Sequence, residues 1–164
     1  MLSLSISSSS DIGAIALILI VDLFGVLYNN HLKSIIMEYY FSKILNVSFD
    51  DAVKLITEAL KSEGFGVISE INMHEKLKEK LGVDFKRYKI LGACNPPYAY
   101  KALLAEDKIG TMMPCNVLVI EQELNKIEIA AVNPIASMQA ISNPSLGTVA
   151  LEMTNKLKKA IDYL

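Results

Sequence analysis

Two cysteines and their immediate neighbours are the residues of this sequence best suited to chemistry. Cys94 lies in "KILGACNP", between an apolar run and Asn95 and Pro96, and Cys115 follows Pro114 in "MMPCN". Proline suits the first position of a helix and the start of a strand, so both cysteines are expected at element boundaries. A helix N-terminus lowers the pKa of a nearby thiol, which would make Cys94 a reactive or metal-binding thiolate.

The two cysteines could act as a pair if their strands are antiparallel neighbours. Cys94 would then end one strand where Cys115 begins the next, and the two sulfurs could form a redox couple or bind a soft metal. In parallel strands they would lie a strand length apart, and the pair hypothesis would fail. Core packing is the competing interpretation, because cysteine is among the residues most often buried.

Few other side chains offer comparable chemistry. His74 is the one imidazole of the expected core domain, because His31 lies upstream of it, and a surface position at a helix start is favoured. Glu70 is a candidate acid or base but is expected on the outer face of a strand. Met112 and Met113 could supply thioether ligands, although methionine more often fills gaps in a core.

Motifs and charge exclude several classes of protein. The sequence lacks the GxGxxG motif of dinucleotide binding, the P-loop, the HExxH motif of zinc proteases, the GxSxG motif of hydrolases and the EF-hand loop. The net charge of −2 gives no electrostatic case for binding nucleic acid or an anionic membrane. Two cysteines are too few for a disulfide framework, which favours a reducing, cytoplasmic location. No cofactor follows from these residues, and both an enzyme and a non-catalytic protein stay open.

The segment before Met37 is expected to be separate from the main domain. Residues 12–28 form an apolar run at the lower length limit for a membrane-spanning helix, and Asp22 near its centre costs about 2.5 to 3.5 kcal/mol. Residues 1–36 therefore have three interpretations: a dispensable extension, a membrane anchor that leaves the main domain in the cytoplasm, or a packed part of the fold. Residues 37–164 are predicted to form one domain.

The order of elements in that domain predicts an α+β fold. Strands are expected at residues 39–45, 65–72, 88–94, 116–122 and 126–132, and helices at residues 48–63, 73–81, 95–107 and 143–164, with a short helical turn within 133–141. Ser48 and Asn95 are expected to cap their helices. Apolar stripes are expected on the helices at 73–81 and 143–164, and the strand at 126–132 is expected to have one wet face. The last two strands form a hairpin, which requires an antiparallel pair. The expected architecture is a two-layer sandwich, a mainly antiparallel sheet with helices packed on one face. A dimer partner could cover the other face.

Three segments resemble a known family. "EGFGVISEINM", "YKILGACNPPYAYKAL" and "MPCNVLV" are similar to the domain of unknown function 302 family, and "VNP" follows the hairpin as that family leads one to expect. The resemblance covers about residues 37–164. It implies a small α+β sandwich similar to the TATA-binding-protein-like fold, assembled as dimers. It also implies a set of motif residues that we take as the candidate binding site: Gly92, Cys94, Asn95, Pro96, Pro114 and Cys115.

Three hypotheses for function follow. The first is a homodimeric accessory protein that binds a small ligand, a metal or a sulfur species near the two cysteines without turnover. The second is a thiol-dependent enzyme or redox protein that uses Cys94 as the thiolate and Cys115 as the resolving partner. The third is a structural interaction module in which both cysteines only pack.

Overall fold

A computed structural model describes residues 38–164 of the chain. The expected extension at residues 1–36, with the apolar run at 12–28 and His31, lies outside the described residues. Within residues 38–164, no helix is both long enough and apolar enough to cross a membrane.

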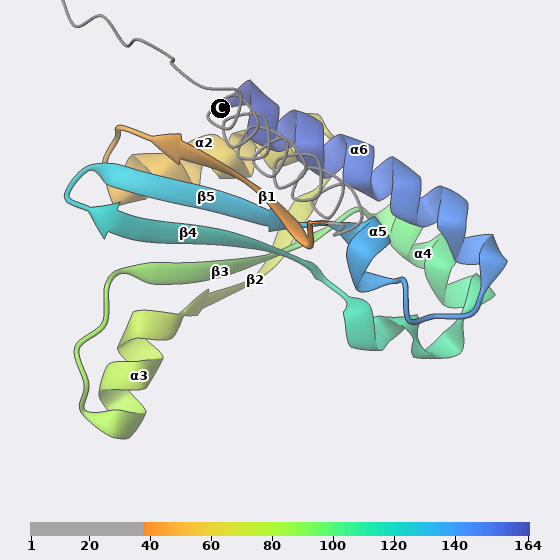
Figure 1. The fold of residues 1–164 in the computed structure, drawn as a ribbon, viewed down its shortest axis with the longest axis horizontal. Coiled ribbons are helices and arrows are strands. Elements are labelled where there is room, and N and C mark those ends of the chain that lie inside the picture. The colour runs from red at the N-terminus through yellow and green to blue at the C-terminus, as the bar shows by residue number, and fades with distance from the viewer. Residues whose placement is uncertain (1–37) are drawn as a thin grey trace, which may run out of the picture. The chain divides into compact units, whose positions relative to one another are not determined.

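Five antiparallel strands form one sheet in the order β1-β5-β4-β3-β2 (Figure 1). The strands are β1 Tyr40–Leu45, β2 Gly66–Asn72, β3 Tyr88–Cys94, β4 Cys115–Glu123 and β5 Lys126–Val132. The predicted antiparallel sheet is confirmed, and each strand lies within one residue of its expected bounds. The β4–β5 hairpin turns at Asn125, whose φ of 60° is a left-handed conformation that asparagine tolerates.

Helices cover one face of this sheet. The α-helices are α2 Phe49–Ser62, α3 Met73–Leu81, α4 Pro96–Ala105, α5 Pro134–Ser137 and α6 Gly147–Tyr163, and two 3₁₀ helices span Asp107–Met112 (η1) and Pro144–Leu146 (η2). α2 and α6 lie against the sheet as the second layer (Figure 1). Ser48 caps α2 as expected, because its hydroxyl accepts a hydrogen bond of 3.2 Å from the backbone N–H of Asp51.

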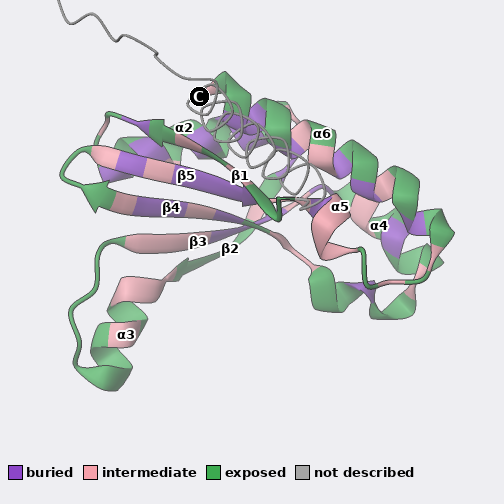
Figure 2. Cartoon of the chain, in the orientation of Figure 1, coloured by how far each residue is buried: buried purple, intermediate pink, exposed green. Residues whose placement is uncertain are grey.

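The main core lies between the helices and the sheet. The apolar stripe expected on α6 is confirmed, since Met153, Leu157 and Ile161 are buried. They pack against the alternating inward residues of the central strands, such as Val117 and Ile129. Figure 2 shows buried segments of β4 and β5 in purple. Burial of this stripe is therefore what fixes α6 on the sheet.

A second, smaller core lies at the end of the sheet where α4 and η1 meet the start of α6. Ile109 of η1 is fully buried there between Ala102 and Leu146, and Met113 and Met138 pack against this cluster. η1 itself was not expected. The helix predicted at residues 95–107 ends at Ala105, and the chain continues in 3₁₀ turns. This small core supports the region described next.

The sheet face away from α2 and α6, here called the open face, is more apolar than expected. β4 is apolar on both faces: Val117 and Val119 point into the core, whereas Leu118 and Ile120 point to the open face. β5 was expected to have a wet face, yet Ala130 on that face is only 5% exposed. Its cross-strand neighbour Leu118 shields it, because β5 lies between two other strands.

The edge strand β2 and the helix after it are exposed. A β-bulge between Val67 and Ser69 interrupts the pairing of β2 with β3. No residue of α3 is buried, although its apolar stripe was predicted, and Leu81 is 67% exposed. α3 projects beyond the sheet and packs only near the start of β3, so its stripe has little surface to cover (Figure 1, Figure 2).

Candidate functional site at the cysteine end of the sheet

The β3–α4 junction has the geometry expected from its sequence. β3 ends at Cys94 and α4 begins at Pro96. Gly92 is required two residues earlier, because a Cβ there would lie 2.7 Å from Cγ of Pro114 and would also overlap the hydroxyl of Ser69. The chain is therefore tightly packed on both sides of β3 just before Cys94.

Asn95 has a different role from the one expected. It occupies the N-cap position of α4, but its side chain makes no capping hydrogen bond. Its Nδ2 instead donates to the carbonyl oxygen of Glu63 at 3.3 Å, and Asn95 is the single buried polar residue in residues 38–164. Gly64, with a φ of +84°, lies directly against this amide. Asn95 thus joins the end of α2 to the start of α4.

The two cysteines lie at the same end of the sheet, here called the cysteine end. β4 begins at Cys115, directly after Pro114, and pairs antiparallel with β3 so that Ala93 lies opposite Cys115. Standard strand spacing then places the Cα atoms of Cys94 and Cys115 roughly 6 Å apart, within the range that a disulfide can bridge. Both thiols are free. Ala93 and Cys115 share one face of the sheet, so the side chain of Cys94 points to the other face and the two thiols point apart. The backbones are close, but this orientation does not favour a disulfide.

Both cysteines line one small cavity of about 40 Å³. Three methionines from separate parts of the chain also line it, so five sulfur-containing residues line the same space: Cys94, Met113, Cys115, Met138 and Met153. The remaining walls are apolar or aromatic apart from Asn95. A volume of this size holds a few water-sized particles but no organic substrate.

Burial raises the pKa of both thiols. The pKa of Cys115 is raised to about 11, first by burial and second by the nearby charge of Cys94. Burial also raises the pKa of Cys94. The lowered pKa that we expected for Cys94 beside a helix N-terminus is therefore wrong, because removal from water outweighs any stabilisation of the thiolate. Both cysteines are protonated near neutral pH.

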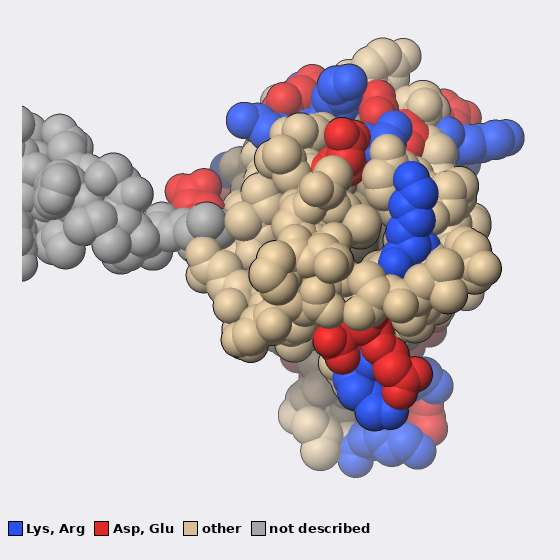
Figure 3. All heavy atoms as spheres, turned by 90° about the vertical axis from the view of Figure 1, so that its right-hand side faces the viewer, with Lys and Arg blue, Asp and Glu red and all other residues tan. Residues whose placement is uncertain are grey.

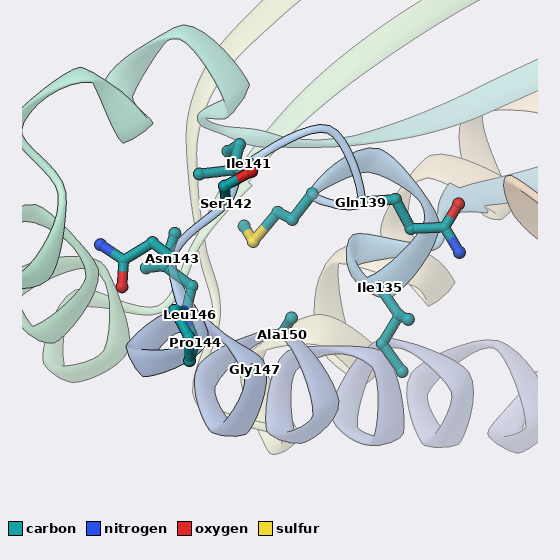
Figure 4. A pocket seen from close by; sticks show the side chains of 10 residues that line it. Ile135, Gln139, Ile141, Ser142, Asn143, Pro144, Leu146, Gly147 and Ala150 are labelled. Atoms are coloured by element: carbon teal, nitrogen blue, oxygen red, sulfur yellow. The ribbon is translucent and has the colours of Figure 1, made fainter.

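A larger groove of about 510 Å³ adjoins this cavity (Figure 4). It runs between α5, η2, the first turns of α6 and the loop that joins α5 to η2. Figure 4 shows Ile135 of α5 and Ala150 of α6 on one side and Ile141 and Asn143 of the loop on another. Met138 lines both the groove and the cavity, so the two lie next to each other.

Asparagine–proline pairs hold the walls of the groove. Asn133 precedes Pro134 and caps α5 by accepting a hydrogen bond of 3.1 Å from the N–H of Ile135. Asn143 precedes Pro144 and caps η2 in the same way, while its Nδ2 donates to the carbonyl of Ala105 at 2.9 Å. The groove is therefore preformed rather than built from loosely held loop residues.

Charged side chains are scarce at this end of the molecule. Figure 3 shows a broad surface of uncharged residues, with most Lys, Arg, Asp and Glu at its margins. The groove lining contains no acidic, basic or histidine side chain; its polar members are Gln139, Ser142 and Asn143. A neutral ligand suits such a surface better than an ion.

The other predicted candidates lie elsewhere. His74 is near the start of β3, with its Nδ1 3.2 Å from the backbone nitrogen of Tyr88, so a strand length of about 20 Å separates it from Cys94. Glu70 forms an exposed ion pair of 2.8 Å with Lys89. Met112 is 39% exposed and does not line the cavity, unlike its neighbour Met113.

Sequence reasoning missed two of the sulfur side chains. Met153 was recognised only as part of the apolar stripe of α6, and Met138 was not singled out at all. Neither lies at a recognisable spacing from Cys94 or Cys115, because α5 and α6 reach the cavity through the tertiary fold. The repeated asparagine–proline pair was the available signal, since each one starts a helix at this end of the molecule.

Comparisons with known proteins agree with the fold. A family model described as "Domain of unknown function DUF302" matches residues 41–164. Among solved structures, the crystal structure of an uncharacterized conserved protein DUF302 from Bacillus stearothermophilus superposes with a TM-score of 0.71 at 28% sequence identity, covering 77% of this chain and 98% of that one. No curated protein matches. These similarities establish the fold and supply no activity.

Proposed function

Because this chain belongs to the DUF302 family, which is defined by a domain of unknown function, we propose its role from geometry: a homodimeric, non-catalytic binding protein whose site lies at the cysteine end. The groove of about 510 Å³ carries this proposal. Its volume falls within the roughly 300 to 1,000 Å³ of small-molecule sites. The ligand that fits is a small, mostly apolar, uncharged molecule.

The groove is better suited to binding than to turnover. General acid–base and nucleophilic catalysis need titratable groups within hydrogen-bond reach of the substrate, and the groove lining offers none. The two cysteines line the neighbouring cavity and not the groove. The thiols are also protonated near neutral pH, which gives the redox alternative less support than the binding hypothesis.

A neutral fluorescent probe tests the groove. N-phenyl-1-naphthylamine should bind the full chain saturably, with a stoichiometry near one per groove. In the Gly147→Phe variant the new ring should fill the groove, because a Cβ at Gly147 meets no atom within 4 Å. We expect at least about a tenfold loss of probe affinity, since a bound ring can no longer be buried there.

Gly110→Phe is the matched control. Gly110 belongs to η1, also has open space around its Cβ position, and does not line the groove. This variant should bind the probe as the unmodified chain does. If Gly147→Phe retained full affinity, or if both variants lost it equally, the groove would not be the binding site.

Dimerisation is the second part of the proposal, and the open face of the sheet supports it. A solvated sheet face normally carries polar residues, whereas Leu118, Ile120 and Val132 lie on this one. The carboxylate of Glu128, which also lies there, accepts a hydrogen bond of 2.5 Å from Nε2 of Gln122. An apolar face of this kind is the pattern of a subunit interface.

Sedimentation measurements on the full chain test this face. We expect a dimer at micromolar concentration and a monomer for Leu118→Lys, because the lysine would place an unpaired charge in the interface. Leu151→Lys is the control, since Leu151 is 50% exposed on α6, away from the open face. A monomeric parent chain, or a dimer that survives Leu118→Lys, would contradict the proposed interface.

A further inference from the structure

Helix α4 presents apolar side chains to solvent at the cysteine end. Ala102 is its one buried residue, and Lys101 is its one charged residue. Tyr100, Leu103 and Leu104, here called the α4 stripe, are all exposed. The two leucines follow the tyrosine by three and four residues, so both adjoin it on one side of the helix. Exposed apolar residues scattered singly are ordinary, whereas a contiguous group marks a surface that contacts something else.

The surroundings of the α4 stripe are poor in charge. Figure 3 views this end of the molecule, and most of its charged side chains lie at the margins. The charge of Lys101 lies over the ring of Tyr98, with Nζ 5.2 Å from the ring centroid. Such a surface offers little complementary charge to a partner protein. A bilayer of zwitterionic lipid needs none, because the burial of apolar side chains drives the contact.

The described chain begins at the same end of the molecule. Tyr40, the first residue of β1, pairs with Val132, the last residue of β5. β5 runs antiparallel to β4, so its last residue lies at the cysteine end. Nδ2 of Asn133 holds the preceding segment there by donating to the carbonyl of Glu38 at 2.8 Å. The upstream chain, with its apolar run at residues 12–28, is therefore joined to the domain at the cysteine end.

We propose that the α4 stripe docks on the surface of a neutral lipid bilayer. Its side chains would enter the boundary between headgroups and acyl chains, where tyrosine is favoured because its ring is apolar and its hydroxyl is polar. A contact of this size binds weakly by itself, and insertion of residues 12–28 would strengthen it by raising the local concentration of lipid. A second copy of the chain is the competing occupant, but the proposed dimer uses the open face instead. Docking of the α4 stripe does not depend on the groove ligand.

A single tryptophan tests the contact, because the chain contains none. Leu104→Trp changes a side chain that is 71% exposed, so the full-length variant should fold. With phosphatidylcholine vesicles, its emission should shift to shorter wavelength. Lipids brominated on their acyl chains should quench it at least about twofold, because an interfacial helix buries its apolar face about 5 to 10 Å deep. Added salt should weaken neither effect, since no charge attraction is involved.

Leu81→Trp is the matched control. Leu81 is similarly exposed at the end of α3, which packs only near the start of β3. Both variants carry residues 12–28, so a difference between them reports the α4 stripe and not the upstream run. Adding Tyr100→Glu to the Leu104→Trp variant should reduce the quenching to the level of Leu81→Trp, since a carboxylate at the lipid boundary opposes burial.

Three results would overturn the inference. One is an emission of Leu104→Trp that vesicles leave unchanged. A second is equal quenching of Leu104→Trp and Leu81→Trp, which would place the lipid contact outside the α4 stripe. The third is a shift in the emission of Leu104→Trp that needs no vesicles and grows with protein concentration, which would show that a second copy covers the stripe.

Discussion

The two ends of β3 differ in almost every physical respect. At the cysteine end, Cys94 lines a small cavity together with uncharged residues from five other segments. At the opposite end, here called the histidine end, β3 begins at Tyr88 beside His74 and α3. That end is exposed and rich in ion pairs, such as Lys78 with Asp84 at 2.7 Å.

The two ends show that some reactive residues are brought together in the interior by the fold, whereas others stay exposed to solvent. Lys76 and Glu79 of α3 form an ion pair of 3.0 Å, yet both are at least half exposed, so the pair contributes little to stability. The cysteines and methionines of the cysteine end carry no charge and come from distant parts of the sequence, yet they line one cavity. In this protein the candidate site forms where residues from distant parts of the sequence are buried together. It does not form where reactive residue types are most frequent in the sequence.

The titration of Cys115 should give the largest effect. Its pKa is raised from 9.0 to about 11 in the folded chain, so the folded state disfavours the thiolate. The contribution to stability is complete below pH 9 and is lost as the pH rises from about 9 to about 11, by about 2 to 3 kcal/mol. Urea unfolding at several pH values measures this loss.

The comparison with Cys115→Ala isolates that group. Lysine and tyrosine residues titrate in the same range in both proteins, so only the difference between their stability profiles reports Cys115. Alkylation at pH 8 provides a second measure, and Cys115 should react about 100-fold more slowly in the folded than in the unfolded chain. Equal stability profiles and rapid alkylation would mean that this end of the sheet is open to water.

Gly92→Ala should give the next largest effect. The new methyl group would lie 2.7 Å from the ring of Pro114, which cannot rotate away, so we expect a loss of about 1 to 3 kcal/mol in unfolding free energy. Gly66→Ala on the neighbouring strand is the control, because a Cβ there meets no atom within 4 Å. Chemical denaturation of both variants checks this, and similar stabilities would refute the tight packing of β3.

Asn95→Ala should cost about 1 kcal/mol. The substitution removes the hydrogen bond from Nδ2 to Glu63 but leaves that carbonyl a second donor, Nζ of Lys156 at 3.4 Å. The loss should appear as faster hydrogen exchange of the backbone amides in the last turn of α2. Unchanged protection there would show that Asn95 does not join α2 to α4.

His74→Ala should give the smallest effect, about 0.5 kcal/mol. It removes a partly exposed hydrogen bond to the backbone of Tyr88 at the histidine end. Thermal unfolding measures the stability, and thiol alkylation rates at the cysteine end should not change. A change in those rates would show that the two ends of β3 are coupled.

Much of the fold could be predicted because it depends on local signals. The β3 bounds follow from an apolar run that meets Pro96, and the α6 stripe follows from helical spacing of its apolar residues. The antiparallel sheet follows from the hairpin. α3 shows the limit of this reasoning, since a correct helical pattern, Met73 to Leu81, says nothing about whether another element is present to cover it.

The candidate site was predictable only in its location. Cys94 and Cys115 were expected beside element boundaries, and whether their strands are antiparallel neighbours was left open; the structure pairs β3 with β4 antiparallel. The role of Asn95 was not, because its partner, the carbonyl of Glu63, is brought near by tertiary packing. The raised pKa values of the two thiols could not be predicted either, because they depend on burial, which the tertiary fold sets and the neighbours in sequence do not.

The bulge in β2 has a consequence for assembly. Exposed edge strands invite another chain to extend the sheet, and Ile68, which is 65% exposed, makes the edge at β2 attractive for this. The extra residue between Val67 and Ser69 breaks the regular spacing of donors and acceptors along that edge. Fibril-like growth through β2 is thereby discouraged, and self-association is directed away from this edge.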